Sequence, residues 1–369
     1  MTHSQRLETW LGPDKVNTLS DSMKDFYWPI PIQGVPGNIY AMPGGDFRGR
    51  ITAGSEVSAL DYCEMQLKKS LKAKRVLQAH RRKQTGMAGF SSLSDLIAEA
   101  STGKRREMAF QKNGATGVTG VTNTLWGSGT HPAAGANAAA APGGESPTDA
   151  TTGAFLFDNV TPDTRHFVMA AVSASVGTNT LLMYDRIFQV NTTMNSIATE
   201  AVTGVPTRYQ SITVTDPDYI GGNFLFVEVG GTALAATAHN WTVCTYLDQA
   251  NAASTLPSLT GNSAAIVRRL DHPVNQWFAP LANGDTGIKA LTQMQSSAAV
   301  ATGVINFVIG HPIAFLPIPI TNMVCPTDGI NTTFNLSRIF DDAALAFLEI
   351  TKPSTTATNY SGTFTMVHG

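Results

Sequence analysis

The chain has 369 residues and a net charge of −2 at pH 7; 43% of its residues are hydrophobic and only 14% are charged. It contains no run of about 18 apolar residues, which excludes a membrane-spanning helix. Its polar first residues lack the apolar stretch of a signal peptide, so we expect synthesis in a cytoplasm. The three cysteines (Cys63, Cys244 and Cys325) are far apart, which excludes CxxC zinc sites and argues against a disulfide framework.

Charge is distributed unevenly along the chain. Residues 1–112 contain 17 Lys and Arg against 11 Asp and Glu, a net charge of +6, whereas residues 113–369 contain 8 against 16, a net charge of −8. Such a low charge density in the second part is unusual for the surface of a freely soluble enzyme. Depletion of charge is typical of the buried centre of protein–protein contacts. We therefore expect the protein to be part of an assembly.

Residues 1–50 are rich in proline and glycine and predict an extended N-terminal arm. Proline and isoleucine alternate after Trp28, and each proline also holds the preceding residue in an extended conformation. The rings of Phe26, Tyr27 and Trp28 cannot be buried within such an arm. We expect these three aromatic side chains to contact a neighbouring subunit; the alternative is a strand that packs against its own domain.

Residues 51–126 predict a helical, basic anchor region. Apolar residues recur at helical spacing between residues 55 and 83, and cations gather on a different face of that helix. The cations of this face are Lys68, Lys72, Arg75 and Arg82. A second short helix is expected after Ser92, which begins a capping-box-like sequence. If the region is a separate anchor, removal of residues 1–112 should leave a folded β domain.

The basic face has three interpretations. We favour docking onto an acidic protein surface, and the alternatives are contact with nucleic-acid phosphates and a face that is only solvated. Aromatic residues are not interleaved with the cations, which argues against stacking on single-stranded nucleic acid.

The rest of the chain predicts a linker followed by a β domain. Residues 127–153 are dominated by Gly, Ala, Pro and Ser, as in a linker or a loosely ordered loop that partners could hold in place. From residue 154 to 369, short β-branched and aromatic runs alternate with turn residues. The predicted strands are His166–Val176 and Thr180–Val190, joined as a hairpin, then Asn223–Val229, Asn240–Leu247, Gly287–Gln293, Gly303–Ile309, Ile313–Ile318, Ala344–Thr351 and Tyr360–Val367.

These features define the expected fold class. It is mainly β with a helical N-terminal region, and residues 154–369 form an antiparallel β-sandwich or jelly roll. The alternation of helices and strands that marks an α/β protein is absent, which makes a nucleotide-binding doubly wound sheet improbable.

Few residues form a pattern that could catalyse a reaction. Asp285-Thr286-Gly287 matches the Asp-Thr-Gly of aspartic proteases, in which paired carboxylates activate water. The apolar strand that should precede this aspartate is missing, and we predict instead that residues 283–285 turn the chain into the next strand. The family patterns of zinc proteases, serine hydrolases and nucleotide-binding loops are absent. We therefore expect no enzyme activity and no cofactor.

Acidic residues elsewhere suggest structural roles. Asp185 and Arg186 are neighbours on a predicted strand, so their side chains point to opposite faces, and each is expected to anchor a buried ion pair or to contact a neighbouring subunit. Residues 216–218 and 341–342 contain paired aspartates that could supply oxygens to calcium. Neither pair has further ligands at loop spacing, so we expect no metal site.

Several segments of the second half resemble a group of virion proteins of tailed bacteriophages. They are 181–186 (LLMYDR), 207–209 (TRY), 284–288 (GDTGI), 344–350 (ALAFLEI) and 362–369 (GTFTMVHG), and the resemblance lies chiefly within residues 154–369. It implies a structural component of the virus particle, located in the virion and assembled in the host cytoplasm.

The resemblance leaves three places in the particle open. The first is a protein that decorates or stabilises the capsid at the shell or a vertex, the second is the major capsid protein, and the third is a tail or collar appendage or receptor-binding module. The major shell fold of tailed phages has its long helix after an extended β loop, whereas here the longest predicted helix precedes the β region. Tail fibres usually show repeats or heptads, which are absent. We favour the first place, with copies of itself and other virion proteins as partners; nucleic acid is less favoured, and no membrane is expected.

Overall fold

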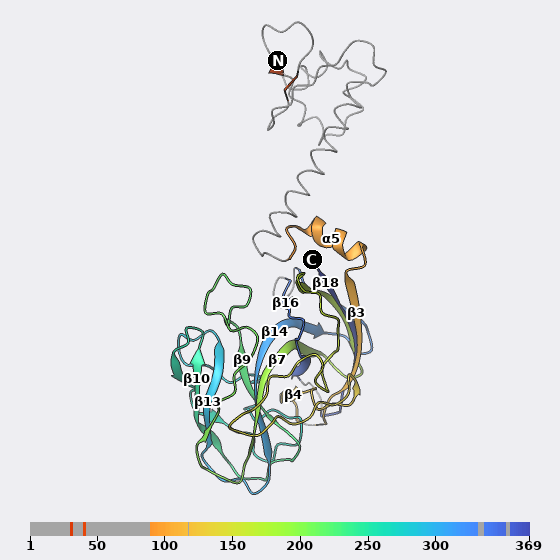
Figure 1. Ribbon diagram of the computed structural model, residues 1–369. Coiled ribbons are helices and arrows are strands. Elements are labelled where there is room, and N and C mark those ends of the chain that lie inside the picture. Colours follow the sequence, from red (N-terminus) through yellow and green to blue (C-terminus); the bar gives the residue numbers. More distant parts are fainter. Residues whose placement is uncertain (1–29, 32–39, 42–88, 117, 331–335, 352–354) are drawn as a thin grey trace, which may run out of the picture. The chain divides into compact units, whose positions relative to one another are not determined.

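The computed structural model describes residues 30–31, 40–41, 89–116, 118–330, 336–351 and 355–369. The chain divides into two units, Met1–Met87 and Ala88–Gly369. In the first unit the described residues are the strands β1 (Ile30–Pro31) and β2 (Tyr40–Ala41), which pair antiparallel. All other described elements belong to the second unit (Figure 1).

One helix, α5 (Leu93–Ser101), is present among the described residues, and it confirms the short helix predicted after Ser92. Ser92 is the N-cap residue, and its Oγ accepts a hydrogen bond from the backbone N–H of Asp95 at 3.1 Å. Such a bond satisfies an N–H group that has no partner within the helix. In the part of the chain that the structure describes, no helix is long and apolar enough to cross a membrane.

The second unit is mainly β and is built from three antiparallel sheets. The first sheet has the order β15-β6-β18-β3-β5, with β16 also on β6; its strands are β3 (Arg105–Asn113), β5 (Thr130–His131), β6 (Arg165–Ala174), β15 (Cys325–Asp328), β16 (Arg338–Ile339) and β18 (Asn359–His368).

The second sheet has the order β4-β17-β7-β14-β9; its strands are β4 (Asn123–Thr124), β7 (Asn179–Thr193), β9 (Phe224–Val229), β14 (Val304–Ile318) and β17 (Leu345–Thr351). The third sheet has the order β11-β10-β13-β8, with β12 also on β10; its strands are β8 (Glu200–Ala201), β10 (Asn240–Asp248), β11 (Ala253–Thr255), β12 (Leu259–Thr260) and β13 (Ile288–Ser296).

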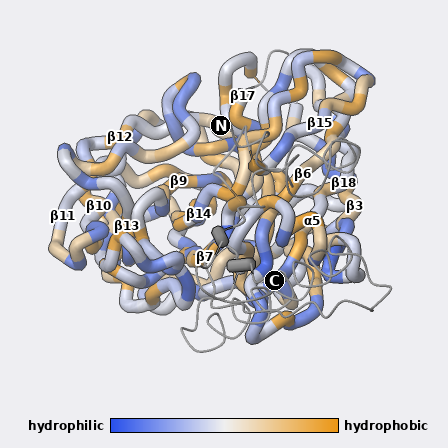
Figure 2. The backbone as a smooth tube through the Cα atoms, turned by 90° about the horizontal axis from the view of Figure 1, so that it is seen from above, coloured by the Kyte–Doolittle hydropathy of each residue, from blue (hydrophilic) through white to orange (hydrophobic). Residues whose placement is uncertain are grey.

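The second sheet is shared by two hydrophobic cores. Its strands β7 and β14 are paired from end to end. One core joins one half of this pair to the first sheet, and includes Leu181, Met183, Leu316, Phe167 and Phe364. The other core joins the opposite half to the third sheet, and includes Val190, Phe307, Trp241, Tyr246 and Leu291. Figure 2 shows that hydrophobic residues follow the strands, while hydrophilic residues are frequent in the outer loops.

Two bulges allow the same face of the shared sheet to carry both cores. The pairing of β7 with β14 skips Ile187 on one strand and Ile313 on the other. An extra residue of this kind shifts the alternation of side chains by one position. Residues 181 and 183 before the bulge therefore share a face with residues 188 and 190 after it. Asp185 and His311 are opposite each other in this register, between the two cores.

The opposite face of the second sheet is covered by loops. A third cluster of buried side chains fills this layer, with Leu182, Tyr184, Phe226 and Val308 from the strands and Trp126 and Leu270 from the covering segments. The shared sheet is thus buried on both faces, and β7 and β14 are accordingly buried or half-buried over almost their whole length instead of alternating between buried and exposed residues.

Residues 105–113, which we predicted to lie in the helical anchor region, form strand β3 instead. This strand pairs with β18 over its whole length, and Phe110 stacks on Phe347 in the core at a centroid distance of 4.5 Å. The cations Lys104, Arg105 and Arg106 lie at the start of this segment, and long-range pairing with β18 holds the segment extended. The anchor region was predicted to extend to residue 126. Strands β3 and β4, which lie in its last part, belong instead to the second unit, as does β5.

The predicted strands from residue 166 onward are confirmed, but the predicted hairpin is wrong. Strand β6 lies in the first sheet and β7 lies in the second, so the turn between them carries the chain from one sheet to the other. Gly303–Ile309 and Ile313–Ile318 were predicted as two strands and form the single strand β14. Pro312 is tolerated inside it because it lies beside a bulge.

Residues 127–153 are packed on the protein's own β7, which differs from the linker predicted there. The backbones of Glu145 and Gln189 exchange two hydrogen bonds, of 2.8 and 2.9 Å, and Ala141 N–H donates to Asn191 O at 3.0 Å. Gly135 lies so close to the Trp126 ring that an added Cβ would be 2.2 Å from it. The contacts with β7 join residues distant in sequence, so composition could not reveal them.

Candidate functional site

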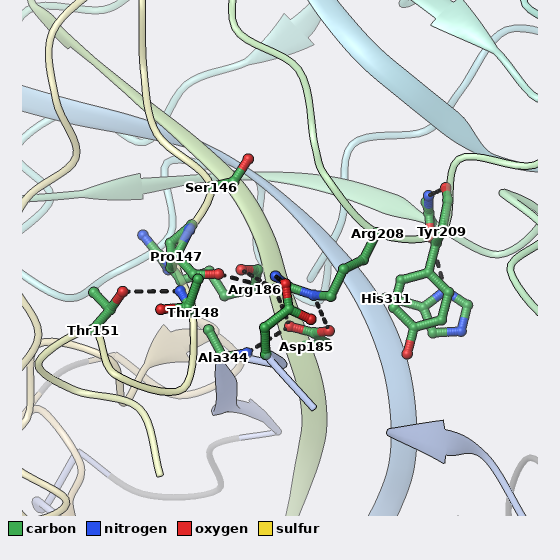
Figure 3. Close-up of polar contacts among 12 residues, drawn as sticks. Ser146, Pro147, Thr148, Thr151, Asp185, Arg186, Arg208, Tyr209, His311 and Ala344 are labelled. Atoms are coloured by element: carbon green, nitrogen blue, oxygen red, sulfur yellow. Dashed lines mark hydrogen bonds and ion pairs between the residues drawn. The ribbon is translucent and has the colours of Figure 1, made fainter. Parts of the chain in front are cut away.

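Charged side chains are buried on both faces of strand β7, at the place where the two cores meet (Figure 3). Asp185 and Arg186 are adjacent on this strand and point to opposite faces, as predicted, and each forms a buried ion pair. A buried charge is costly unless it is paired and hydrogen-bonded. The partners of these two residues therefore determine what this part of the molecule can do.

Asp185 forms a two-point ion pair with Arg208, which comes from the loop after β8. The Arg208 Nη2 donates to Asp185 Oδ1 at 2.7 Å, and its Nε donates to Oδ2 at 2.9 Å. The backbone N–H of Ala344 also donates to Asp185 Oδ1, at 2.9 Å. Paired bonds of this type match the planar guanidinium to the carboxylate, which makes them stronger than a single contact.

Arg208 joins further segments to the same point. Its Nη2 donates to the carbonyl oxygen of Pro147 at 3.0 Å, and its Nη1 lies 3.4 Å from Asp342 Oδ2. Four segments therefore meet at one ion pair: strand β7, the loop at Arg208, the covering segment at Pro147 and the approach to β17 (Figure 3).

A ring stack between the buried Tyr209 and the half-buried His311 continues the cluster beside Arg208. The rings of Tyr209 and His311 are parallel, with centroids 3.7 Å apart and an interplanar angle of 8°. The Tyr209 hydroxyl donates to Arg338 O at 3.1 Å, and Asn223 Oδ1 lies 2.7 Å from His311 Nδ1. Because the amide oxygen of Asn223 can only accept, we assign the ring proton of His311 to Nδ1.

Arg186 forms the second ion pair on the opposite face of the sheet. Its Nη2 donates to Glu228 Oε1 at 2.6 Å, and Asn306 Nδ2 donates to the same oxygen at 3.1 Å. The Arg186 guanidinium also lies over the Trp126 ring, 4.9 Å from its centroid. This arrangement connects β7, β9 and β14 to the covering segment through side chains that are all buried.

Burial and pairing shift several pKa values in the cluster. Burial raises the pKa of Asp185, and Arg208 opposes this shift. Burial lowers the pKa of Arg208, but the carboxylate of Asp185 outweighs it, so the pKa lies above its usual value. Burial lowers the pKa of His311 to about 3, so this ring is neutral at ordinary pH. The guanidinium of Arg208 therefore stays charged and holds its segment in place.

The cluster has the properties of a structural junction. Its donors and acceptors bond to one another and to backbone atoms, and Asp185, Arg186 and Arg208 are each at most 2% exposed. A substrate would need access to at least one of these groups, and a general acid or base must reach the atom that it protonates or deprotonates. The two ion pairs join the two cores and the covering segment to one another.

The turn predicted at residues 283–285 is confirmed. Gly284 has a φ of +95°, a conformation that favours glycine, and strand β13 begins at Ile288. The Asp285 carboxylate accepts a hydrogen bond of 2.6 Å from the Tyr246 hydroxyl, a partner that holds the turn against β10. Asp285 is therefore engaged in a structural contact at this turn.

The predicted aspartate pair at residues 341–342 lines a polar cleft of about 440 Å³ at the edge of the first sheet. Asp341 accepts hydrogen bonds from the Thr161 hydroxyl at 2.7 Å and lies 3.5 Å from Arg165. Asp218 belongs to the other predicted aspartate pair and does not line this cleft. Its carboxylate accepts a hydrogen bond from the Tyr209 N–H at 2.5 Å. Among the described residues, no group of three or more His, Cys, Asp or Glu side chains is placed to hold a metal ion.

The predicted partner-binding residues lie outside the residues that the structure describes. They are Phe26, Tyr27, Trp28, Lys68, Lys72, Arg75 and Arg82. Their roles remain predictions from the sequence.

Sequence reasoning missed the residues that complete the cluster. Arg208 and Glu228 are single charges in a loop and a strand, and nothing in their local sequence indicates a partner far away in the chain. Lys112 was missed too: it is buried in β3, and its Nζ donates to the carbonyl oxygens of Pro132 at 2.8 Å and Ser128 at 3.0 Å. Burial lowers the pKa of Lys112 to about 8. The one available signal was the low number of cations after residue 112, which makes each of them a candidate for a structural role.

Comparisons with known proteins give little beyond this geometry. No protein-family model and no curated protein matches the chain. Among solved structures, the chain is similar to one described as "Structure of infectious bursal disease virus Gx strain", with a TM-score of 0.15 and 8% sequence identity. The match covers 72% of this chain and 81% of that one. At this TM-score the likeness carries no argument about fold or function.

Proposed function

We propose that the protein is a non-enzymatic structural component of a virus particle, which decorates or stabilises the capsid through contacts between subunits. The observation that carries the proposal is the order in which eight strands pair within the first two sheets. In chain order these strands are β3, β4, β6, β7, β14, β15, β17 and β18.

The first of these strands pairs with the last, the second with the seventh, the third with the sixth and the fourth with the fifth. The pairs are β3·β18, β4·β17, β6·β15 and β7·β14. Strands β18·β6 and β17·β7 then join these pairs into the two sheets. A long hairpin folded over in this way is a jelly roll, an arrangement found in viral capsid and lectin domains. We therefore assign the first two sheets to a jelly-roll sandwich.

The third sheet enters this sandwich as an insertion. Strands β8–β13 all lie between β7 and β14, the fourth and fifth strands of the jelly roll. Because β7 and β14 extend beyond the first sheet, the insertion packs on the same strands that form the sandwich. The result is a long double body with more surface for neighbours than an eight-stranded sandwich alone.

The distribution of cations supports a role in an assembly. Five of the described cations are buried: Lys112, Arg165, Arg186, Arg208 and Arg269. The surface of the second unit is consequently poor in exposed positive charge, and it carries exposed apolar side chains such as Leu156 and Val214. Low charge together with exposed apolar groups favours contact between subunits.

The choice of a tailed bacteriophage and of a decorating role rests on the sequence. The segments that resemble phage virion proteins lie in the β body, and the arm and basic face of residues 1–112 would supply contacts to the shell or to a vertex. Copies of this chain and other virion proteins are the proposed partners, with nucleic acid as a less favoured partner of the basic face.

A second candidate is the capsid shell itself, and the jelly-roll strand order specifically favours it. In that case the contacts between copies of this chain would build the shell without another protein beneath them. A tail appendage or receptor-binding module is supported only by the occurrence of jelly rolls in lectin domains.

Quantitative mass spectrometry of purified particles tests the proposal. A count of hundreds of copies, measured relative to the portal, is expected for a shell or decorating protein. A count near that of the portal would instead indicate a vertex, neck or tail position. Absence from the particles would contradict the structural role. Expression of the chain alone then separates the two candidates, because only a shell protein should form closed particles by itself.

A further inference from the structure

We propose that the loop of residues 210–219, here called the finger, docks on an apolar patch around Arg269 of a second copy of this chain. This inference rests on the proposed role in an assembly, and it names the surfaces that would make the contact. The patch is formed by the exposed side chains of Val118, Ile266, Val267 and Val274, which lie in two paired segments on either side of Arg269.

The finger is held firmly at its base. Ser211 N–H donates to Asp218 O, and Ile220 N–H donates to Ser211 O, each at 3.0 Å. The residue before the finger, Tyr209, is buried in the ring stack with His311. The finger extends as a green loop beyond β9 in Figure 1. A loop fixed in this way loses little conformational entropy when it binds, which increases the affinity available from its contacts.

The tip of the finger exposes apolar side chains and an acid. Val214 is 73% exposed and Ile212 is 56% exposed, although both are β-branched residues suited to a core. Asp216 is also exposed, and no ion pair within the described residues involves it. Its Oδ1 accepts a hydrogen bond from the Asp218 N–H at 2.8 Å. The carboxylate therefore keeps its charge available for a partner.

The patch lies on two segments that run side by side in the layer covering the second sheet. Thr124 N–H donates to Arg268 O at 2.8 Å, and Asn275 N–H donates to Gly120 O at 2.8 Å. Side chains near both ends of this pairing are exposed and apolar; they are Val118, Ile266, Val267 and Val274. Groups of exposed apolar side chains on a soluble protein commonly mark an interaction surface.

Arg269 gives the patch a charge that lacks a partner. The side chain is 9% exposed, and its Nε has no hydrogen-bond partner among the described residues. Burial lowers the pKa of Arg269, with no contribution from a carboxylate. A buried guanidinium without a carboxylate is unfavourable. A partner that offers one acid between apolar side chains would relieve this cost.

The finger has the composition that the patch requires. It presents two β-branched apolar groups and one unpaired aspartate, and the patch presents apolar groups and one unpaired arginine. The apolar side chains of both surfaces are exposed in the same copy, so we place their contact between copies. Such a contact joins two different surfaces, and contacts of this type propagate into rings or extended arrays. This is the geometry that a repeating protein layer needs.

A mixing experiment with the full-length chain tests the contact. Val214→Asp places a charge at the tip of the finger and should prevent the finger from docking. Val274→Asp places a charge in the patch and should prevent the patch from receiving the finger. Sedimentation velocity should show that each variant alone associates at least about tenfold more weakly than the wild type. An equimolar mixture of the two should form a one-to-one complex, because one protein supplies an intact patch and the other an intact finger.

The control is Ile197→Asp, which places the same charge at a residue that is 54% exposed and lies outside both surfaces. It should associate like the wild type. If Val274→Asp does not fold, as judged by circular dichroism, Val118→Asp replaces it. Wild-type association in both variants, or failure of their mixture to form the complex, would overturn the contact. A wild-type chain that stays monomeric would also overturn it, whereas the copy number in particles decides the proposed function separately.

Discussion

At the scale of single residues, the junction between the two cores depends on charges that are buried and paired. Asp185 and Arg208 are at most 2% exposed and form two direct hydrogen bonds. Removal of one partner leaves the other charge in an environment of low polarity, and this is more costly than loss of the pair as a whole. The junction should therefore be sensitive to changes that keep the shape of a side chain but remove its charge.

Asp185→Asn tests this sensitivity. The amide keeps the size of the side chain but leaves the Arg208 guanidinium without its counter-ion, so the free energy of unfolding should fall by about 3–5 kcal/mol. Urea denaturation followed by circular dichroism measures the change. Asp342→Asn is the matched control, because the Asp342 side chain is 49% exposed and lies 3.4 Å from the same arginine. The free energy of unfolding of this control should fall by less than about 1 kcal/mol. Similar losses for both variants would contradict the junction.

The half-buried imidazole of His311 makes the fold sensitive to acid. Its pKa of about 3 in the folded state lies below the ordinary value of about 6.5. Between these values the unfolded chain binds a proton that the folded chain does not, so stability falls as pH falls through this window. The expected slope is up to about 1.4 kcal/mol for each pH unit.

Replacement of His311 by Gln should remove this slope. The free energy of unfolding of wild type and variant, measured by urea denaturation from pH 7 to pH 4, should converge as the pH falls. Burial also lowers the pKa of His272, to about 4, so the variant keeps part of the acid sensitivity. Parallel curves for the two proteins would show that His311 does not contribute.

At the scale of elements, β3 shows how distant pairing determines local structure. Its sequence combines cations at one end with Phe110 and Lys112 at the other, and only the last part has the alternating burial of a half-buried strand. Strand β18 pairs with β3 on one side and with β6 on the other. The C-terminal strand therefore needs β3 in place to complete the first sheet.

Truncation of the chain tests the position of β3. Removal of residues 1–87 should leave a folded protein with a cooperative thermal transition, because the second unit begins at Ala88. Removal of residues 1–112 should abolish that transition, since it deletes the whole of β3 except Asn113 and uncovers the core around Phe364. Circular dichroism during heating distinguishes the two fragments. A cooperative transition in both would mean that β3 is dispensable for the fold.

At the scale of the whole molecule, one pair of long strands organises the architecture. Strands β7 and β14 each span 15 residues and contribute to both cores on one face. The buried junction at Asp185 lies between those cores, so it fixes how the first two sheets and the inserted third sheet are joined. The double body that results carries the finger and the patch, and the mixing experiment tests whether these surfaces connect one copy to the next.

Some features of this protein follow from its sequence alone. The β character after residue 154, the positions of most long strands, the short helix after Ser92 and the turn at residues 283–285 depend on local spacing and turn chemistry, which neighbouring residues determine. The opposite directions of Asp185 and Arg186 also follow from the period of a strand. The low charge of the second part is a property of composition, and the prediction of an assembly rests on it.

Other features were decided only by the tertiary structure. Strand β3, the division of β6 and β7 between two sheets, the continuity of β14 and the packing of residues 127–153 all depend on partners distant in the sequence. Arg208 and Glu228 became recognisable as ion-pair partners only when the sheets brought them to β7. Local sequence determines whether a segment can be a strand, but the burial of apolar surface over the whole chain selects the strand beside which it lies, because that free energy belongs to the assembled core and not to the segment.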